Sequence, residues 1–258
     1  MRIDKYLVEN SYFETRNKAV HAIKSGIVFC DGKVIIKPSF VISKGKVTIN
    51  GSPLKYVSKG GLKLEKALES FSINLENKKM LDIGSSTGGF TDCALQNNVD
   101  SVIAVDVGSN QMVDKVKKNA KVSLYEGQDI RTLNKSLMLD VDLTTIDVSF
   151  ISVTKFISIF DNMDNLKEII CLIKPQFECG KEVAKRYRGI VLNNEVHSSV
   201  IKDVINEFNQ YNFYLNGLVT SPIKGGSGNL EYLAYFKKDL NSNNQMINID
   251  KLVNSNFS

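Results

Sequence analysis

The sequence predicts an α/β fold: a Rossmann-like, mostly parallel sheet with an antiparallel hairpin at one edge, preceded by a small α+β domain. From residue 58 onward, short apolar segments alternate with helical segments, which is the order that produces a doubly wound sheet. Residues 1–50 instead predict two short helices and a hairpin. At 258 residues and 43% hydrophobic content, the chain is long enough for one full domain and a small companion.

The N-terminal domain begins with two predicted helices, over residues 2–13 and 15–25. Thr15 can cap the second helix, and Gly26 can take the left-handed conformation that ends it. The Asp31-Gly32 pair between two apolar segments predicts a hairpin turn, and a further strand follows it. These elements predict a compact unit of about fifty residues.

Seven apolar segments predict the strands of the second domain. The last two are joined by a short glycine-rich turn, which suits an antiparallel hairpin. The expected strands are 80–83, 101–106, 122–125, 143–147, 168–173, 215–221 and 230–236. The expected organisation is a domain over 1–50, a linker over 51–57, a second domain over 58–238 and a loosely held tail over 239–258, which is rich in Asn and Ser.

Positive charge is concentrated near the N-terminus. The formal net charge of +5 is ordinary for a metabolic enzyme, but its distribution is uneven. Residues 1–66 contain thirteen Lys or Arg and five Asp or Glu, a net charge of +8, so the remainder of the chain has a net charge of −3. This asymmetry favours a polyanionic partner for the N-terminal domain.

Composition also disfavours several classes of protein. The four cysteines show no C-x-x-C spacing, and the two histidines lie far from any ligand cluster, so we expect neither a disulfide framework nor a metal site. No apolar run approaches the roughly 18 residues needed to cross a bilayer, and the N-terminus lacks a signal-peptide core. We therefore expect a cytoplasmic protein without a membrane span.

The N-terminal motifs resemble the alpha-L RNA-binding module of a small-subunit ribosomal protein, tyrosyl-tRNA synthetases and pseudouridine synthases. The resemblance is carried by Arg2-Ile-Asp-Lys-Tyr-Leu, by the Thr15-Arg16 helix start and by Asp31-Gly32-Lys33-Val34. It implies that this domain binds structured RNA, although a basic helix face is often merely solvated. The residues expected to contact RNA are Arg2, Lys5, Arg16, Lys18, Lys24, Lys33 and Lys37.

A glycine-rich turn follows the first strand of the second domain and leads into a helix, where backbone N–H groups can face a ligand. Asp106 ends the next strand, where a carboxylate accepts hydrogen bonds from a ribose diol. Ser86 stands where a dinucleotide-binding site prefers glycine, so the turn favours a nucleoside cofactor without a diphosphate. S-adenosylmethionine is the common cofactor of that kind. The turn residues expected to bind this cofactor are Asp82, Gly84, Ser85, Thr87, Gly88, Gly89 and Phe90.

Two further strand ends carry carboxylates that would face the same cofactor. Asp129 would accept a hydrogen bond from the adenine amino group, and Asp147 would face the reaction centre at the carboxyl edge of the sheet. Any one acidic strand end could instead cap a helix or lie in a surface loop. Four of them in register, counting Asp82 and Asp106, favour a binding site.

Lys63, Lys174 and Glu231 are candidates for catalysis. Lys174 follows a continuous apolar run and precedes Pro175, so we expect it at the end of a buried strand, where an ordinary lysine would have to extend back to water. Together with Asp147, these three residues form a Lys-Asp-Lys-Glu set.

This set resembles that of the FtsJ-type ribose 2′-O-methyltransferases, and the TlyA family is similar over nearly the whole chain. The resemblance implies S-adenosylmethionine-dependent methylation of a cytidine ribose in 23S rRNA, in some members also in 16S rRNA, within ribosomal subunits. Members have also been labelled haemolysins. The motifs that carry it are Ser58-Lys-Gly-Gly-Leu-Lys-Leu, Asp82-Ile-Gly-x-Ser-x-Gly-Gly-Phe-Thr, Val105-Asp-Val-Gly, Asp147-Val-Ser-Phe-Ile-Ser, Leu172-Ile-Lys-Pro-Gln-Phe-Glu and Ser221-Pro-Ile-x-Gly-x-x-Gly-Asn-x-Glu.

The resemblance also implies catalytic roles. A ribose hydroxyl is a poor nucleophile at neutral pH, so the enzyme must orient it and help to remove its proton. By analogy with the family, Lys174 is the expected base, and Lys63 would position the hydroxyl or a neighbouring phosphate. Asp147 and Glu231 would hold the two ammonium groups in place.

The segment after Phe177 predicts a mobile basic loop beside this site. RNA backbone contact is one role for it, with Tyr187 available to stack on a base, and an exposed loop without a role is the alternative. The residues expected to contact RNA there are Lys181, Lys185, Arg186 and Arg188.

Three other functions fit parts of the sequence. Ser86 and the N-terminal domain count against a nicotinamide-dependent oxidoreductase on the same fold. The intact four-residue set counts against a non-catalytic RNA-binding or assembly factor. A membrane-lytic protein would need a spanning or amphipathic lytic segment that the sequence does not show.

Overall fold

The computed structural model describes the chain except for residues 14, 25, 51–54, 239–246 and 258. The chain divides into two compact units, Met1–Lys55 and Tyr56–Ser258, and each contains its own hydrophobic core. Most of the expected linker lies outside the described residues, whereas Tyr56 is buried in a core of the larger unit.

The smaller unit is an α+β fold whose core is formed by residues such as Ile3, Leu7 and Ile23, all inaccessible to solvent. Its three strands form an antiparallel sheet in the order β2-β1-β3. Asp31 and Gly32 both have positive φ, +48° and +75°, as a two-residue hairpin turn requires, so the predicted hairpin is confirmed. The elements are α1 (Ile3–Glu9), α2 (Arg16–Lys24), β1 (Val28–Cys30), β2 (Lys33–Val34) and β3 (Val47–Ile49).

The first helix is shorter than the sequence predicts. It ends at Glu9 rather than near Phe13, because the backbone N–H groups of Tyr12 and Phe13 both turn back to the carbonyl of Leu7. This return places Phe13 in the core. The start of α2 is as predicted: the hydroxyl of Thr15 accepts the backbone N–H of Lys18 at 3.3 Å.

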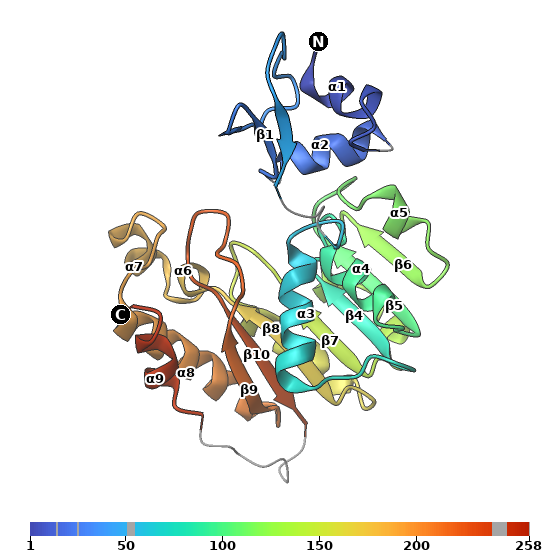
Figure 1. The fold of residues 1–258 in the computed structure, drawn as a ribbon. Helices are drawn as coiled ribbons and strands as arrows, with labels where there is room; N and C mark the ends of the chain where they lie inside the picture. Colours follow the sequence, from blue (N-terminus) through green and yellow to red (C-terminus); the bar gives the residue numbers. More distant parts are fainter. Residues whose placement is uncertain (14, 25, 51–54, 239–246, 258) are drawn as a thin grey trace. The chain divides into compact units, whose positions relative to one another are not determined.

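The larger unit is built on a seven-stranded sheet in the order β6-β5-β4-β7-β8-β10-β9 (Figure 1). Only β10 runs against its neighbours, and it pairs antiparallel with both β8 and β9. The sheet therefore confirms the predicted mostly parallel topology with an antiparallel hairpin at one edge. The strands are β4 (Lys79–Ile83), β5 (Ser101–Asp106), β6 (Val122–Glu126), β7 (Leu143–Ile146), β8 (Glu168–Ile173), β9 (Tyr214–Thr220) and β10 (Tyr232–Lys237).

Helices cover both faces of this sheet. Apolar side chains of α3 and α4 pack in one core cluster, and those of α8 and the 3-10 helix η3 pack in another. This three-layer arrangement leaves the carboxyl edge of the parallel strands for loops, which is where such folds bind ligands. The elements are α3 (Gly60–Phe71), α4 (Gly89–Gln96), α5 (Asp114–Lys117), η1 (Ile130–Thr132), η2 (Lys135–Met138), η3 (Val153–Asn162), α6 (Pro175–Glu178), α7 (Lys181–Arg186) and α8 (Asn194–Gln210).

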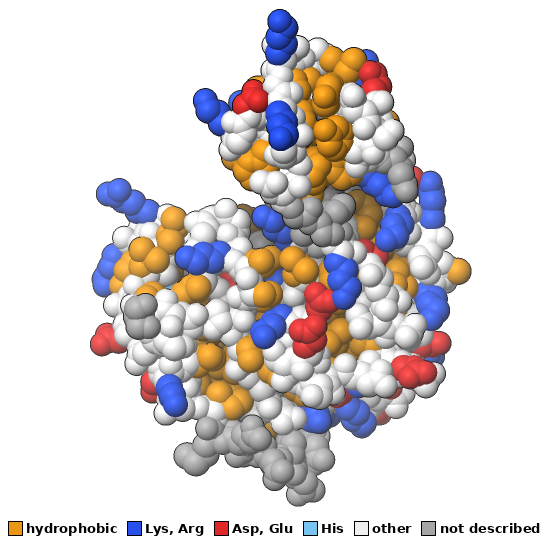
Figure 2. Space-filling view, in the orientation of Figure 1, with side chains coloured by type: hydrophobic (Ala, Val, Ile, Leu, Met, Phe, Trp, Pro, Cys, Tyr) orange, Lys and Arg blue, Asp and Glu red, His pale blue; other side chains and the backbone are white. Residues whose placement is uncertain are grey.

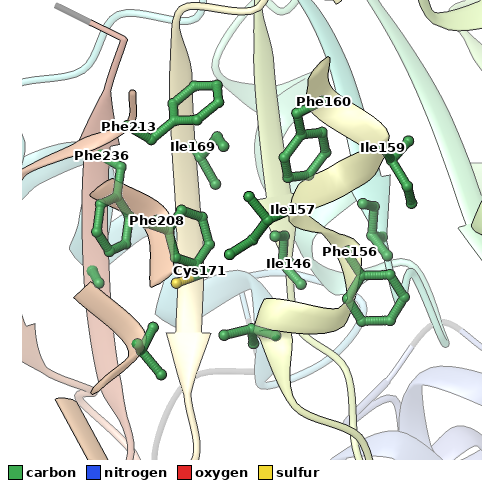
Figure 3. Close-up of a cluster of buried hydrophobic side chains, with 14 of the residues drawn as sticks. Ile146, Phe156, Ile157, Ile159, Phe160, Ile169, Cys171, Phe208, Phe213 and Phe236 are labelled. Carbon is green, nitrogen blue, oxygen red and sulfur yellow. The ribbon is translucent and has the colours of Figure 1, made fainter. Parts of the chain in front are cut away.

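Phenylalanine rings pack in two pairs within the second of these clusters (Figure 3). Phe208 of α8 stacks on Phe236 of β10 with ring centroids 4.2 Å apart, and Phe160 of η3 meets Phe213 edge to face at 6.2 Å. Burying each of these side chains contributes roughly 1.5–3 kcal/mol relative to exposing it. The packing fixes α8 and η3 against the sheet that carries the site.

The end of the chain differs from the expected loosely held tail. Residues 239–246 lie outside the described residues, but α9 (Ile249–Asn254) follows them, with Val253 fully buried and the ring of Phe257 edge-on to His197 at 5.1 Å. This end of the chain is rich in Asn, but it also contains a short amphipathic pattern. Its apolar residues are three or four positions apart and therefore share one helix face.

Candidate active site

Two adjoining cavities open in the larger unit around the carboxyl ends of the parallel strands. One has a volume of about 470 Å³ and the other about 590 Å³. Gly84, Asp147 and Phe150 line both of them. Asp106 and Asp129 line the first, which we call the cofactor cavity, whereas the second holds the charged catalytic candidates and is called the catalytic cavity below.

The turn after β4 brings the backbone close to both cavities. Gly84 has a φ of +84°, and a Cβ there would lie 2.5 Å from the carbonyl oxygen of Asp147, so only glycine fits. Ser85, Thr87, Gly89 and Phe90 of the predicted cofactor set line the catalytic cavity rather than the cofactor cavity. Gly88 instead caps α4 with a φ of +90°. The turn therefore forms the wall between the two cavities.

The carboxylate of Asp106 is held at the cofactor cavity by backbone donors. One oxygen accepts the N–H of Ser86 at 2.8 Å and the other accepts the N–H of Gly108 at 2.7 Å. Asp129 lines the same cavity, but its two oxygens already accept the guanidinium of Arg131, which lowers the pKa of the carboxyl. The two predicted acceptors thus differ in their partners, since Asp129 already binds a positively charged group and Asp106 binds backbone N–H groups.

Asp82 lines neither the cofactor cavity nor the catalytic cavity. Its side chain is fully buried between two hydroxyls: Thr91 donates to Oδ2 at 2.7 Å and Thr145 donates to Oδ1 at 2.8 Å. Burial raises the pKa of Asp82 to about 6, although both hydrogen bonds oppose the shift. The structure therefore places this predicted cofactor residue behind the turn, where it links β4, α4 and β7.

Replacing Asp82 by asparagine tests this placement. Because the folded state binds the Asp82 proton more tightly than the unfolded state, ionising Asp82 costs stability progressively between about pH 4 and pH 6. The Asp82→Asn protein should therefore gain free energy of unfolding relative to wild type across that window, by about 3 kcal/mol. Urea unfolding of both proteins from pH 4 to pH 8 measures the difference, and parallel pH profiles would contradict it.

The four catalytic candidates lie together although they come from four elements. Lys63 is in α3, Asp147 and Lys174 follow β7 and β8, and Glu231 precedes β10. Lys174 Nζ lies 2.6 Å from Asp147 Oδ1, Lys63 Nζ lies 3.7 Å from Asp147 Oδ2, and Lys63 Nζ lies 2.7 Å from Glu231 Oε2. Since β10 is antiparallel, its start shares an edge with the ends of β7 and β8, which brings Glu231 into this chain of ion pairs.

Burial distinguishes this cluster from a surface ion-pair network. Lys63, Lys174 and Glu231 are 9%, 6% and 3% exposed, and all three line the catalytic cavity. Lys174 Nζ also donates to the carbonyl of Val148 at 2.8 Å and to Ser149 Oγ at 3.1 Å. These acceptors fix the amine at one point of the cavity wall.

Two aromatic residues and an amide at this site were not among the predicted residues. Phe150 is 90% exposed and lines both cavities, has a φ of +68°, and its ring lies 5.1 Å from that of Phe177. Gln176 also lines the catalytic cavity. A non-glycine residue in the left-handed region is uncommon, and such strain gathers at functional sites. No pattern in the sequence marks Phe150, because an apolar residue is assigned to the core by default.

The predicted RNA-binding residues are all exposed, but they are distributed over both units. Arg2, Lys5, Arg16, Lys18, Lys24, Lys33 and Lys37 are on the surface of the smaller unit, where Figure 2 shows basic side chains projecting around hydrophobic ones. The expected basic loop is a helix, α7, since Lys181, Lys185 and Arg186 belong to it and Arg188 follows it. All four basic residues of this segment face solvent.

Two classes of feature are not found in the part of the chain that the structure describes. No group of three or more His, Cys, Asp or Glu side chains there could hold a metal ion. Among the same residues, no helix has the length and apolar character needed to cross a membrane.

The sheet order, the glycine turn and the two cavities define a Rossmann-like methyltransferase. Residues 56–238 match the FtsJ-like methyltransferase family, and residues 1–43 match the S4 domain. The chain therefore belongs to the FtsJ-like methyltransferase family and has an N-terminal S4 domain.

Similar proteins cover nearly the whole chain. Hemolysin A of Brachyspira hyodysenteriae is 40% identical over 92% of this chain and 99% of its own length. The 23S rRNA (cytidine-2′-O)-methyltransferase TlyA of Campylobacter jejuni is 35% identical over 93% of this chain and its full length. Among solved structures, a Streptococcus thermophilus protein described as a hemolysin is 36% identical, with a TM-score of 0.76 over 99% of this chain and 94% of its own.

Proposed function

We propose that this protein transfers a methyl group from S-adenosylmethionine to the 2′-hydroxyl of a cytidine in 23S rRNA. The observation that carries the proposal is the buried chain of ion pairs from Lys174 through Asp147 and Lys63 to Glu231, in a cavity that adjoins the glycine turn. The named activity of the Campylobacter jejuni relative, at 35% identity over its full length, supports the same reaction and substrate.

The residues around the cofactor cavity fit S-adenosylmethionine. Asp106 presents a carboxylate suited to a ribose diol, and the absence of a side chain at Gly84 lets a ligand approach the backbone. On the other side of the turn, in the catalytic cavity, Ser85 Oγ is buried without a hydrogen-bond partner among the described residues, so it is available to a polar group of the cofactor that extends toward the methyl acceptor. When bound, this cofactor supplies a methyl group that its sulfonium has already activated.

The ion-paired residues would prepare the hydroxyl. In its neutral form, the Lys174 amine can accept the proton that the hydroxyl loses as its oxygen bonds to the methyl carbon. Asp147 and the carbonyl of Val148 hold that amine in place, and Lys63, held by Glu231, would position the hydroxyl or the adjacent phosphate. Each lysine thus has a carboxylate partner that fixes its position.

RNA contact would extend from this cavity to other surfaces of the chain. Phe150 offers an exposed ring at the junction of the two cavities, and a splayed-out nucleobase can stack on such a ring. The basic residues of α7 and of the S4 domain supply charge for the RNA backbone. Recognition by a separate RNA-binding domain would explain the concentration of positive charge in residues 1–66.

The proposal is tested with labelled S-adenosylmethionine and ribosomal subunits that lack this modification. Large subunits, small subunits and naked 23S rRNA are incubated with the full-length protein, and the labelled nucleotide is mapped by reverse transcription at limiting nucleotide concentration. We expect label at one cytidine ribose of 23S rRNA. Label at 16S rRNA as well would broaden the substrate, whereas label on a base, or none despite cofactor binding, would contradict the proposed reaction.

A further inference from the structure

A single buried carboxylate joins two arginines at the surface of the smaller unit. Asp4 is 1% exposed, and its oxygens accept four hydrogen bonds from two guanidinium groups. The Nε and Nη2 groups of Arg2 lie 3.1 Å from Asp4 Oδ1 and Oδ2, respectively. The same groups of Arg16 lie 2.9 and 2.7 Å from Oδ2.

This carboxylate remains charged because of its partners. Burial alone would raise the pKa of Asp4, but the two guanidinium groups outweigh it and lower the pKa to about 2. A buried charge of this kind is costly unless it is fully paired, so Asp4 fixes the orientation of both arginines. Arg2 precedes α1 and Arg16 begins α2, so one side chain aligns the starts of two helices.

The two arginines are held in place but not covered. Their side chains are 46% and 52% exposed, and Asp4 binds only the Nε and Nη2 groups of each. The remaining N–H groups of both guanidiniums are therefore left for another partner. The two positive charges and the single negative charge of Asp4 give a local net charge of +1. Guanidinium groups with planar, fixed donors match the oxygens of a phosphate.

We propose that Asp4 is a positioning residue that holds Arg2 and Arg16 as one preorganised site for an RNA backbone phosphate. The inference rests on the proposed function, since it names the part of the S4 domain that would contact the rRNA substrate. Flexible arginines lose side-chain conformational entropy when they bind a phosphate, and prior fixation by Asp4 reduces that loss.

Replacing Asp4 by an uncharged residue separates two effects on RNA affinity, one of net charge and one of arginine positioning, because they have opposite signs. Asp4→Asn makes the unit more positive by one charge, so an effect of charge alone would tighten RNA binding. Loss of positioning would weaken it, because both arginines become mobile. Glu9→Gln is a matched control: Glu9 lies in the same helix, is exposed, and its replacement changes the net charge by the same amount.

The experiment measures binding of the full-length proteins to unmodified 23S rRNA at several KCl concentrations, with methyl transfer measured alongside. We expect Asp4→Asn to raise the Kd and the KM for rRNA about tenfold or more, with kcat and cofactor affinity unchanged. The slope of log K against log salt should fall by about 1 for the lost phosphate contact. Glu9→Gln should bind as tightly as wild type or more tightly.

A second variant covers the case in which Asp4→Asn unfolds the smaller unit. Arg16→Lys preserves both the charge and an ion pair with Asp4, but it removes the planar donors, and we expect it to weaken rRNA binding as well. The proposal is overturned if Asp4→Asn binds like Glu9→Gln, or if Arg16→Lys binds like wild type. If the wild-type protein methylates no rRNA at all, the proposed function fails instead, so the two failures are distinguishable.

Discussion

Replacing Lys174 by alanine is expected to lower the turnover number for methyl transfer by about 100- to 10,000-fold, the range that a positioned general base supplies. The amine lies 2.6 Å from Asp147 and donates to the carbonyl of Val148, so its position in the cavity is fixed. Cofactor affinity should change little, because Lys174 lines the catalytic cavity and not the cofactor cavity. Single-turnover transfer to ribosomal subunits measures the effect.

Two other lysines of the same cavity make this result interpretable. Lys59 lines the catalytic cavity but is exposed, so Lys59→Ala should reduce turnover only slightly. Lys63→Ala should weaken substrate positioning, which raises the KM for rRNA, while it leaves Lys174 in place. If Lys174→Ala retained the same pH dependence as wild type, or turned over like Lys59→Ala, Lys174 would not be the base.

The larger sheet could be predicted from the sequence because its signals are local. Each parallel strand is a short apolar run, and the turn between β9 and β10 is rich in glycine. The end of α1 and the packing of α9 could not be predicted in the same way. Both depend on long-range burial, of Phe13 in one core and of Val253 in another, which overrides local composition.

Part of the candidate site could be predicted from strand ends, but its geometry could not. Asp147 and Lys174 follow parallel strands, which share one carboxyl edge, so these two could be expected to meet. Lys63 lies in α3 and Glu231 precedes the antiparallel strand β10, so the strand-end rule does not place them. Asp82 shows the limit of that rule. It is also near a strand end, but its side chain points between Thr91 and Thr145, and side-chain direction on a strand depends on register with its neighbours.

Phe150 shows a second limit of sequence reasoning. An apolar residue is assigned to the core by default, whereas a φ of +68° holds this ring out at the rim of both cavities. A positive φ at a non-glycine residue depends on the surrounding loop and not on the residue type, so the sequence does not reveal it. Residues with strained backbone, such as Phe150, are therefore the site residues that only the structure reveals.

Replacing Asp106 by alanine is expected to raise the Kd for S-adenosylmethionine by about 10- to 100-fold, the worth of hydrogen bonds to a charged acceptor. Asp129→Ala should have a much smaller effect, although both carboxylates line the cofactor cavity. The difference follows from their partners: Asp106 is held by backbone N–H groups, whereas Asp129 already forms an ion pair with Arg131. Calorimetric titration of each variant with the cofactor measures both. Equal losses would mean that Asp129 leaves Arg131 when the cofactor binds, and an effect confined to Asp129→Ala would remove Asp106 from the site.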